Sequence, residues 1–166
     1  MIIKKILILA FSMILISNSV FAAGTDNNSG SKVKKLSSYE SAIKKIQKAK
    51  KYDQKGKDKK AKKYFKEALK FLYKANKENP FDPDTLNYLG FANRKVGNLK
   101  DAEIYYLMGL EIKPDHVGIN EYLGELYVNT NRIDQAKTRL KVLESCSCDE
   151  YQELKDIIEG KTKSKY

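Results

Sequence analysis

The sequence is poor in the side chains from which most catalytic and metal sites are built. It contains no tryptophan, one histidine (His116) and two cysteines among 166 residues. General acid–base catalysts and zinc sites draw mainly on histidine, cysteine and carboxylates, and the paired CxxC motifs of zinc sites are absent from this sequence. We therefore predict no catalytic residue, no metal and no cofactor. His116 follows Pro114 and Asp115 and is expected in a turn or at a helix cap.

Arginine is scarce as well, and the positive charge is unevenly distributed. Lysine outnumbers arginine 29 to 3, and the net charge is +11. Residues 31–79 contain 18 lysines and 5 acidic residues, a net charge of +13. Residues 80–166 contain 12 basic and 15 acidic residues, a net charge of −3. Because a lysine-rich composition fits an AT-rich genome as well as a selected function, the charge alone does not identify a partner.

The apolar run near the N-terminus is too short to span a membrane. It covers residues 6–16 and follows two lysines, whereas a membrane-spanning helix needs about 20 residues. We predict a cleavable signal peptide at residues 1–22, cleaved between Ala22 and Ala23, and a periplasmic or secreted location. The alternative is an uncleaved membrane anchor; no cysteine follows the cleavage region, which disfavours a lipoprotein. Residues 23–37 are predicted to form a flexible linker.

Two similar pentapeptides lie 34 residues apart, LNYLG at 86–90 and NEYLG at 120–124. The residues around them keep the same spacing. The first copy has Leu86, Leu89, Gly90, Asn93, Ala102, Tyr106 and Pro114; the second has Asn120, Leu123, Gly124, Tyr127, Ala136 and Leu140. A weaker copy lies 41 residues before the first, at Ala49, Tyr52, Gly56, Ala61, Phe65 and Ala68. The seven additional residues predict that the second helix of the first pair is about two turns longer than usual.

This pattern resembles the tetratricopeptide repeat (TPR), and within that family it is similar to small exported TPR proteins of alphaproteobacteria. The resemblance implies an all-α fold of stacked antiparallel helix pairs in a right-handed superhelix. Three pairs are expected, at about 38–80, 81–114 and 115–146, followed by a capping helix at 149–159 and a disordered tail at 161–166. The small residues Gly90 and Gly124 are expected where the two helices of a pair approach closely.

The resemblance also implies a groove for a protein or peptide partner, lined mainly by the first helix of each pair. The expected groove residues are Asn87, Phe91, Arg94 and Lys95 in one copy and Glu121, Glu125 and Val128 in the next. An exposed phenylalanine beside an arginine and a lysine resembles a binding hot spot. The alternative is that Phe91 packs against a neighbouring helix.

Lysines recur at steps of three and four along the second helix of the first pair. They are Lys59, Lys63, Lys66, Lys70 and Lys74, and they lie opposite the apolar positions of that helix. This basic stripe is a candidate surface for an acidic partner or for anionic lipid. The alternative is an ordinary solvated helix face. Nucleic acid would suit the charge but not the predicted export.

The two cysteines, Cys146 and Cys148, are separated by one residue. In an oxidising compartment we expect a structural disulfide between them. Its loop is so short that chain entropy contributes only about 1.6 kcal/mol before strain. Free thiols, pairing with another chain, or thiol–disulfide exchange are the alternatives.

Together these features predict an exported, non-enzymatic interaction module that binds a protein or peptide partner through its helical groove. Two alternatives remain. One is a redox protein that uses Cys146 and Cys148, and the other is a basic protein that binds an anionic surface of the cell envelope. The sequence predicts neither the identity of the partner nor the oligomeric state.

Overall fold

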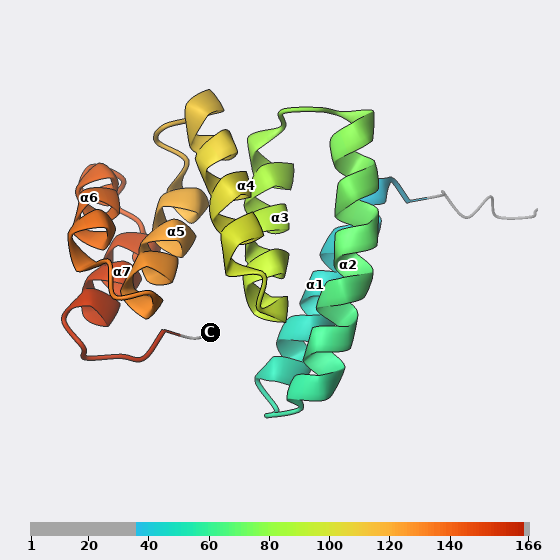
Figure 1. Ribbon diagram of the computed structural model, residues 1–166, viewed down its shortest axis with the longest axis horizontal. Coiled ribbons are helices and arrows are strands. Elements are labelled where there is room, and N and C mark those ends of the chain that lie inside the picture. The colour runs from blue at the N-terminus through green and yellow to red at the C-terminus, as the bar shows by residue number, and fades with distance from the viewer. Residues whose placement is uncertain (1–35, 165–166) are drawn as a thin grey trace, which may run out of the picture. The chain divides into compact units, whose positions relative to one another are not determined.

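The computed structural model describes residues 36–164, which fold into seven α-helices and no strand (Figure 1). The helices are α1 (Ser38–Asp53), α2 (Asp58–Glu78), α3 (Pro83–Val96), α4 (Leu99–Ile112), α5 (Val117–Asn129), α6 (Ile133–Leu143) and α7 (Asp149–Ile158). This architecture confirms the predicted all-α, TPR-like helical repeat. The predicted signal peptide, its cleavage site at Ala22 and Ala23, and most of the predicted linker lie outside the described residues.

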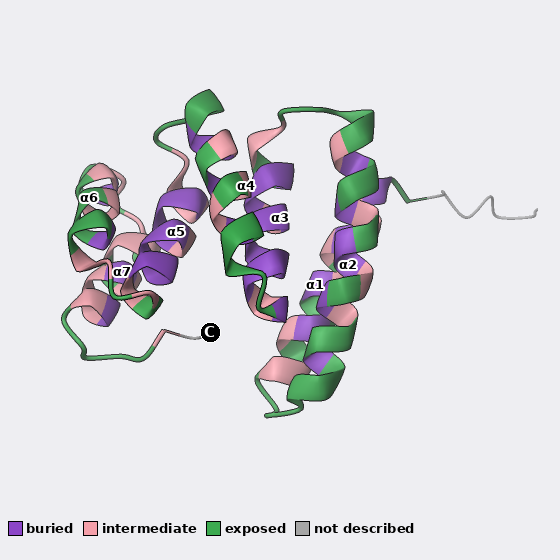
Figure 2. Cartoon of the chain, in the orientation of Figure 1, coloured by how far each residue is buried: buried purple, intermediate pink, exposed green. Residues whose placement is uncertain are grey.

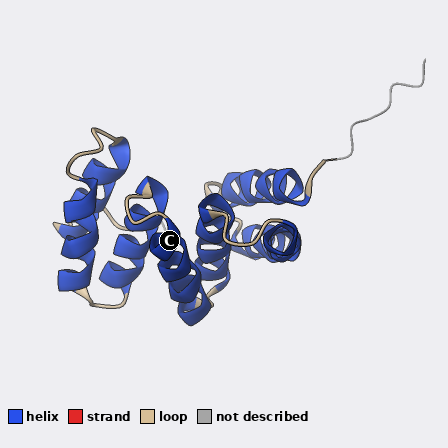
Figure 3. Cartoon of the chain, turned by 90° about the horizontal axis from the view of Figure 1, so that it is seen from above, coloured by secondary structure: helices blue, strands red, loops and turns tan. Residues whose placement is uncertain are grey.

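Successive helices pack as three antiparallel pairs, α1 with α2, α3 with α4, and α5 with α6 (Figures 1 and 3). The last helix, α7, packs against both α5 and α6. Helix α2 has 21 residues and α4 has 14, a difference of seven, so the longer second helix of the first pair is confirmed. Within residues 36–164, no helix combines the length and the apolar character that a membrane span requires.

Capping side chains mark the starts of α1, α3 and α5, the first helices of the three pairs. Ser37 and Glu40 form a capping box on α1, in which the Glu40 N–H donates to Ser37 Oγ at 3.1 Å. Asp82 accepts the Thr85 N–H at 2.9 Å ahead of Pro83, the first residue of α3. His116 caps α5 by accepting the Ile119 N–H at 3.2 Å, as the sequence predicted. Each cap satisfies a backbone donor that the helix itself leaves unpaired.

Two apolar clusters run through the stack, and Figure 2 shows the buried residues on the helix faces that meet other helices. The first cluster joins α1, α2 and α3, with Phe65, Leu72 and Leu89 among its fully buried members. The second joins α4, α5 and α6, with Tyr106 and Leu123 among its fully buried members. A helix pair alone cannot cover both of its apolar faces, so neighbouring pairs are needed to bury them.

Gly90 and Gly124 lie where helices approach most closely. A Cβ atom at Gly90 would lie 2.4 Å from Cε1 of Tyr106, which belongs to the partner helix α4. A Cβ atom at Gly124 would lie 2.5 Å from Cδ2 of Leu154. The close neighbour of Gly124 therefore comes from α7, and not from α6 as the pair rule led us to expect.

Replacing either glycine with leucine should destabilise the fold. We expect Gly90→Leu and Gly124→Leu each to lower the free energy of unfolding by about 1–3 kcal/mol or more, because the new side chain overpacks the contact. Urea denaturation followed by circular dichroism measures this change. Lys137→Leu, at an exposed position of α6, is the control and should stay within about 0.5 kcal/mol of the parent. Unchanged stability of both glycine variants would contradict the packing described above.

Candidate functional site

Two ion pairs connect the first helices of the three pairs. Lys95 of α3 places its Nζ 2.5 Å from Oδ2 of Asp53 on α1. Arg94 of α3 places its NH1 2.9 Å from Oε2 of Glu125 on α5, and both of these side chains are almost fully buried, with exposed fractions of 3% and 1%. The predicted groove residues of α3 and α5 are therefore brought together. We call this set the inner face: Asn87, Phe91, Arg94, Lys95, Glu121, Glu125 and Val128.

Phe91 is not exposed, so the predicted phenylalanine hot spot is wrong. The side chain has an exposed fraction of 0%. Its ring centroid lies 5.6 Å from that of Phe65 on α2 and 5.1 Å from that of Tyr122 on α5. Phe91 faces α5, the first helix of the next pair, so its ring belongs to the interface between helix pairs. The alternative that Phe91 packs against a neighbouring helix is correct.

Most of the inner face is buried rather than open. Asn87, Arg94, Glu121 and Glu125 are buried, whereas Lys95 and Val128 are half-buried. The Asn87 amide nitrogen lies close to Gly118 in the first turn of α5, and its Oδ1 atom has no hydrogen-bond partner in the structure. The inner face is thus a polar seam between α3 and α5 whose half-buried edge meets solvent.

The sequence carries a signal for the buried ion pair in the spacing of its two residues. Arg94 and Glu125 are 31 residues apart. This separation is three residues, or about one helical turn, shorter than the 34-residue period of the repeat. Residues at this separation on successive first helices lie opposite each other. Opposite charges at such a separation are therefore a signal that could have located the seam.

Tyr106 connects the apolar contact at Gly90 to the polar seam. Its ring lies against Gly90, and the side chain is fully buried. Burial raises the pKa of the Tyr106 hydroxyl, which also feels the charges of Arg94 and Glu125. The phenol therefore stays protonated and extends the polar seam into the core.

Glu121 lies one helical turn before Glu125 on α5 and faces two further carboxyl groups from α7. Burial raises the pKa of Glu121 to about 8, and the charge of Glu125, a hydrogen bond with Glu153 and the charge of Glu150 act in the same direction. At neutral pH Glu121 is consequently protonated. Its neutral carboxyl group allows Glu125 to pair with Arg94 without an unscreened like charge beside it.

The described part of the C-terminal tail reaches the inner face. Ser164 Oγ donates to Glu125 Oε2 at 2.7 Å, and Asn129 Nδ2 donates to Ser164 Oγ at 3.0 Å. Lys161 Nζ lies 2.5 Å from Glu159 Oε2. Residues 161–164 thus have defined contacts. Residues 165–166 of the predicted tail lie outside the described residues, and its disorder stays a prediction.

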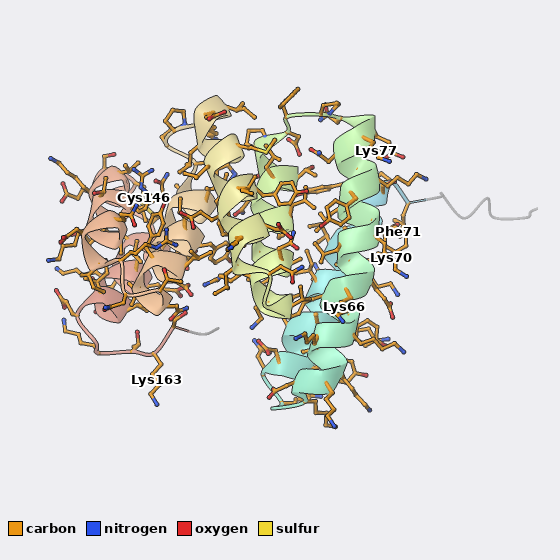
Figure 4. All side chains as sticks on the ribbon, viewed as in Figure 1. Lys66, Lys70, Phe71, Lys77, Cys146 and Lys163 are labelled. Carbon is orange, nitrogen blue, oxygen red and sulfur yellow. A yellow bond between two sulfur atoms is a disulfide. The ribbon has the colours of Figure 1, made fainter. Side chains whose placement is uncertain are left out.

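The lysines of the basic stripe are all exposed on α2: Lys59, Lys63, Lys66, Lys70 and Lys74. Figure 4 labels Lys66 and Lys70 on this helix. A surface pocket of about 580 Å³ lies among Lys59, Lys62, Lys63, Lys66, Glu67 and Lys70. A second pocket of about 520 Å³ lies on α1 among Lys44, Gln47, Lys48, Lys51, Tyr52 and Lys55. Positive charge therefore covers both helices of the first pair.

Aromatic rings lie between the lysines of this pair. Tyr52 of α1 and Tyr64 of α2 stack with ring centroids 5.4 Å apart. Lys48 Nζ lies 4.6 Å from the Tyr64 centroid, and Lys60 Nζ lies 5.6 Å from the Tyr52 centroid. These cation–π contacts hold lysine side chains on the outer surface of the pair.

Cys146 and Cys148 lie next to each other in the turn between α6 and α7, where Figure 4 labels Cys146. Their Cα atoms are 5.2 Å apart, a separation that a disulfide spans. Ser147 between them has a positive φ of 49°. The geometry suits the predicted bridge, and both the bridge and a redox role stay predictions.

No protein-family model matches this chain. A stretch of 59 residues, 36% of the chain, is 42% identical to a TPR repeat-containing protein of Pseudomonas aeruginosa and covers 10% of that protein. The match thus spans about a tenth of that relative's length. It supports the TPR resemblance, and with it a protein-interaction module. The narrower likeness to small exported alphaproteobacterial proteins stays a prediction.

The buried carboxyl group of Glu121 should make stability depend on pH. Its pKa rises from 4.5 to about 8 on folding, so between these values the folded state holds a proton that the unfolded state has released. Stability should therefore fall as pH rises from about 4.5 to about 8. Glu121→Gln removes this loss because glutamine stays neutral.

Thermal melts of parent and variant between pH 4 and pH 9 measure the effect. We expect the melting temperature of Glu121→Gln, relative to the parent, to increase from pH 5 to pH 8. Glu111→Gln, at an exposed position of α4, should show no such trend. A difference between Glu121→Gln and parent that is constant with pH would show that Glu121 ionises normally.

Proposed function

We propose that this protein is an exported interaction module, periplasmic or secreted, that binds a protein or peptide partner at its inner face and has no catalytic activity of its own. The similarity to a TPR repeat-containing protein supports a protein-interaction role. The observation that carries the proposal is the contact between Ser164 and Glu125 at 2.7 Å. Through it the inner face already accepts a stretch of chain that has no secondary structure.

The inner face has the chemistry that recognition of an extended peptide needs. Arg94 holds the Glu125 carboxylate in place. The second contact of that carboxylate comes from Ser164, which lies outside the helices. A charged acceptor fixed in this way binds a hydroxyl or amide donor more strongly than a mobile surface carboxylate does. Half-buried Val128 and Tyr122 provide apolar surface beside it. Direct hydrogen bonds over an apolar surface are typical of specific interfaces.

A variant that blocks the edge of the inner face should abolish partner binding. Val128→Arg introduces a long cation beside Glu125. Because Val128 packs on the edge of the second apolar cluster, an unchanged circular dichroism melt must show that the variant is folded. The mature protein, with and without this change, serves as bait in an envelope extract of the cells that make it, and bound proteins are quantified by mass spectrometry. We expect the partner to be depleted at least tenfold with Val128→Arg.

The matched control is Ile104→Arg, the same kind of change on the outer surface of α4, where Ile104 has an exposed fraction of 54%. This variant should retain the partner. Equal recovery with parent and Val128→Arg would place partner binding elsewhere on the molecule.

A second candidate function is binding of an anionic surface of the cell envelope by the first helix pair. It is favoured by one observation: the five stripe lysines are all exposed, and only Lys74 among them has an acidic residue within 4 Å, namely Glu78 at 3.7 Å. Exposed lysines near an anionic membrane each contribute about 1 kcal/mol. The stripe therefore has the charge needed for reversible surface binding.

Binding to vesicles at low and high salt tests this candidate. We expect the parent to bind vesicles with 30% anionic lipid at 50 mM salt and to release them as salt screens the charges. Changing Lys59, Lys63, Lys66, Lys70 and Lys74 to glutamine should weaken binding at least tenfold. The control changes five other exposed lysines, Lys100, Lys113, Lys137, Lys141 and Lys163, and so has the same net charge. Equal losses in the two variants would mean that net charge matters and the stripe does not.

A further inference from the structure

The end of α7 directs the chain back towards α5. Gly160 adopts a left-handed backbone conformation, with a φ of 70°, which L side chains rarely adopt. The Lys161 N–H then donates to the Asp156 carbonyl oxygen at 2.9 Å. This helix-terminating turn reverses the chain, so the next residues run beside α5 instead of continuing the axis of α7 (Figure 1).

Ser164 is the residue through which this segment contacts the inner face. It donates to Glu125 Oε2 at 2.7 Å and accepts from Asn129 Nδ2 at 3.0 Å. Glu125 is the same carboxylate that pairs with Arg94. The segment is therefore bound at the centre of the polar seam. Lys163, by contrast, is exposed and points away from the helices in Figure 4.

Ser164 is the side chain of this segment that contacts the inner face. Lys161 pairs with Glu159 at the end of α7, its Nζ 2.5 Å from Oε2, and Lys163 is exposed. The serine hydroxyl therefore makes the contact with the seam.

We propose that residues 161–164 are a built-in competitor of the partner: they dock on the inner face through Ser164 and must leave before a partner peptide binds there. This inference rests on the proposed function in one respect, namely that the partner uses the inner face. Ser164 is held by hydrogen bonds with Glu125 and Asn129 of α5. Hydrogen bonds of this kind are exchanged for bonds to water or to another donor at little net cost, so a partner can displace the segment.

The covalent connection of the segment to α7 raises its local concentration at the inner face. A short flexible linker gives the tethered segment an effective concentration on the order of 1 mM. If the free segment binds with a Kd of about 0.1 mM, the tethered one occupies the inner face about 90% of the time. A competitor then binds about tenfold more weakly than it would to the open face.

The test uses the full mature chain and a fluorescent peptide that copies residues 160–166. Ser164→Glu places a carboxylate against Glu125 and should expel the tethered segment by charge repulsion. We expect the peptide, followed by fluorescence anisotropy, to bind the Ser164→Glu chain about tenfold more tightly than the parent chain. Ser164 lies outside the helices, and an unchanged circular dichroism melt shows that the variant is folded.

Two controls make the result specific. Lys163→Glu changes the charge at the neighbouring exposed residue and should leave peptide binding as in the parent. A peptide with glutamate in place of the serine should bind neither chain. Equal binding of the copied peptide to parent and Ser164→Glu, or binding to neither, overturns the inference.

The outcome of this peptide experiment is independent of the outcome of the capture experiment with Val128→Arg. If the peptide behaves as expected and Val128→Arg retains its partner, the tail docks but the partner binds elsewhere. If Val128→Arg loses its partner and the peptide does not distinguish parent from Ser164→Glu, the inner face binds a partner without a built-in competitor.

Discussion

The ring of Tyr106 lies against the bare backbone of Gly90, and both the middle helix pair and the inner face depend on this contact. With no side chain at Gly90, α3 and α4 approach closely enough for the ring to fill the space between them. The same side chain carries its hydroxyl towards Arg94 and Glu125. One residue thus connects apolar packing within a pair to the polar seam between pairs. A change that moves the ring would also disturb the charged groups on which binding is proposed to depend.

The two ends of the stack are finished in different ways. At the C-terminal end, Leu154 of α7 packs on Gly124 as Tyr106 packs on Gly90, so α7 takes the place of a further repeat. At the other end, the outer surface of α1 and α2 carries lysines around the stacked rings of Tyr52 and Tyr64. A terminal repeat needs a polar outer surface because no neighbour covers it. The basic surface is therefore explained in part by its position at the end of the stack, whatever it binds.

The repeat spacing in the sequence predicted the three pairs and the longer α2, and the preceding Pro114 and Asp115 predicted a turn or a helix cap at His116. These features depend on residues close in sequence or on a period that every copy shares. The same reasoning failed for Phe91, because a single helix viewed alone suggests one apolar and one exposed side. In the stack, α3 lies between other helices and buries ten of its 14 residues. The contact between Ser164 and Glu125 left no pattern, since it joins single residues 39 positions apart.

We propose that the face formed by α3 and α5 is the binding surface of this protein. Backbone amide NMR of the ¹⁵N-labelled mature chain, titrated with the captured partner, tests it most directly. The account predicts that chemical shift changes concentrate at residues 87–95 and 121–129, together with release of residues 161–164. Changes confined to the outer surface of α1 and α2, with the inner face unaffected, would contradict it.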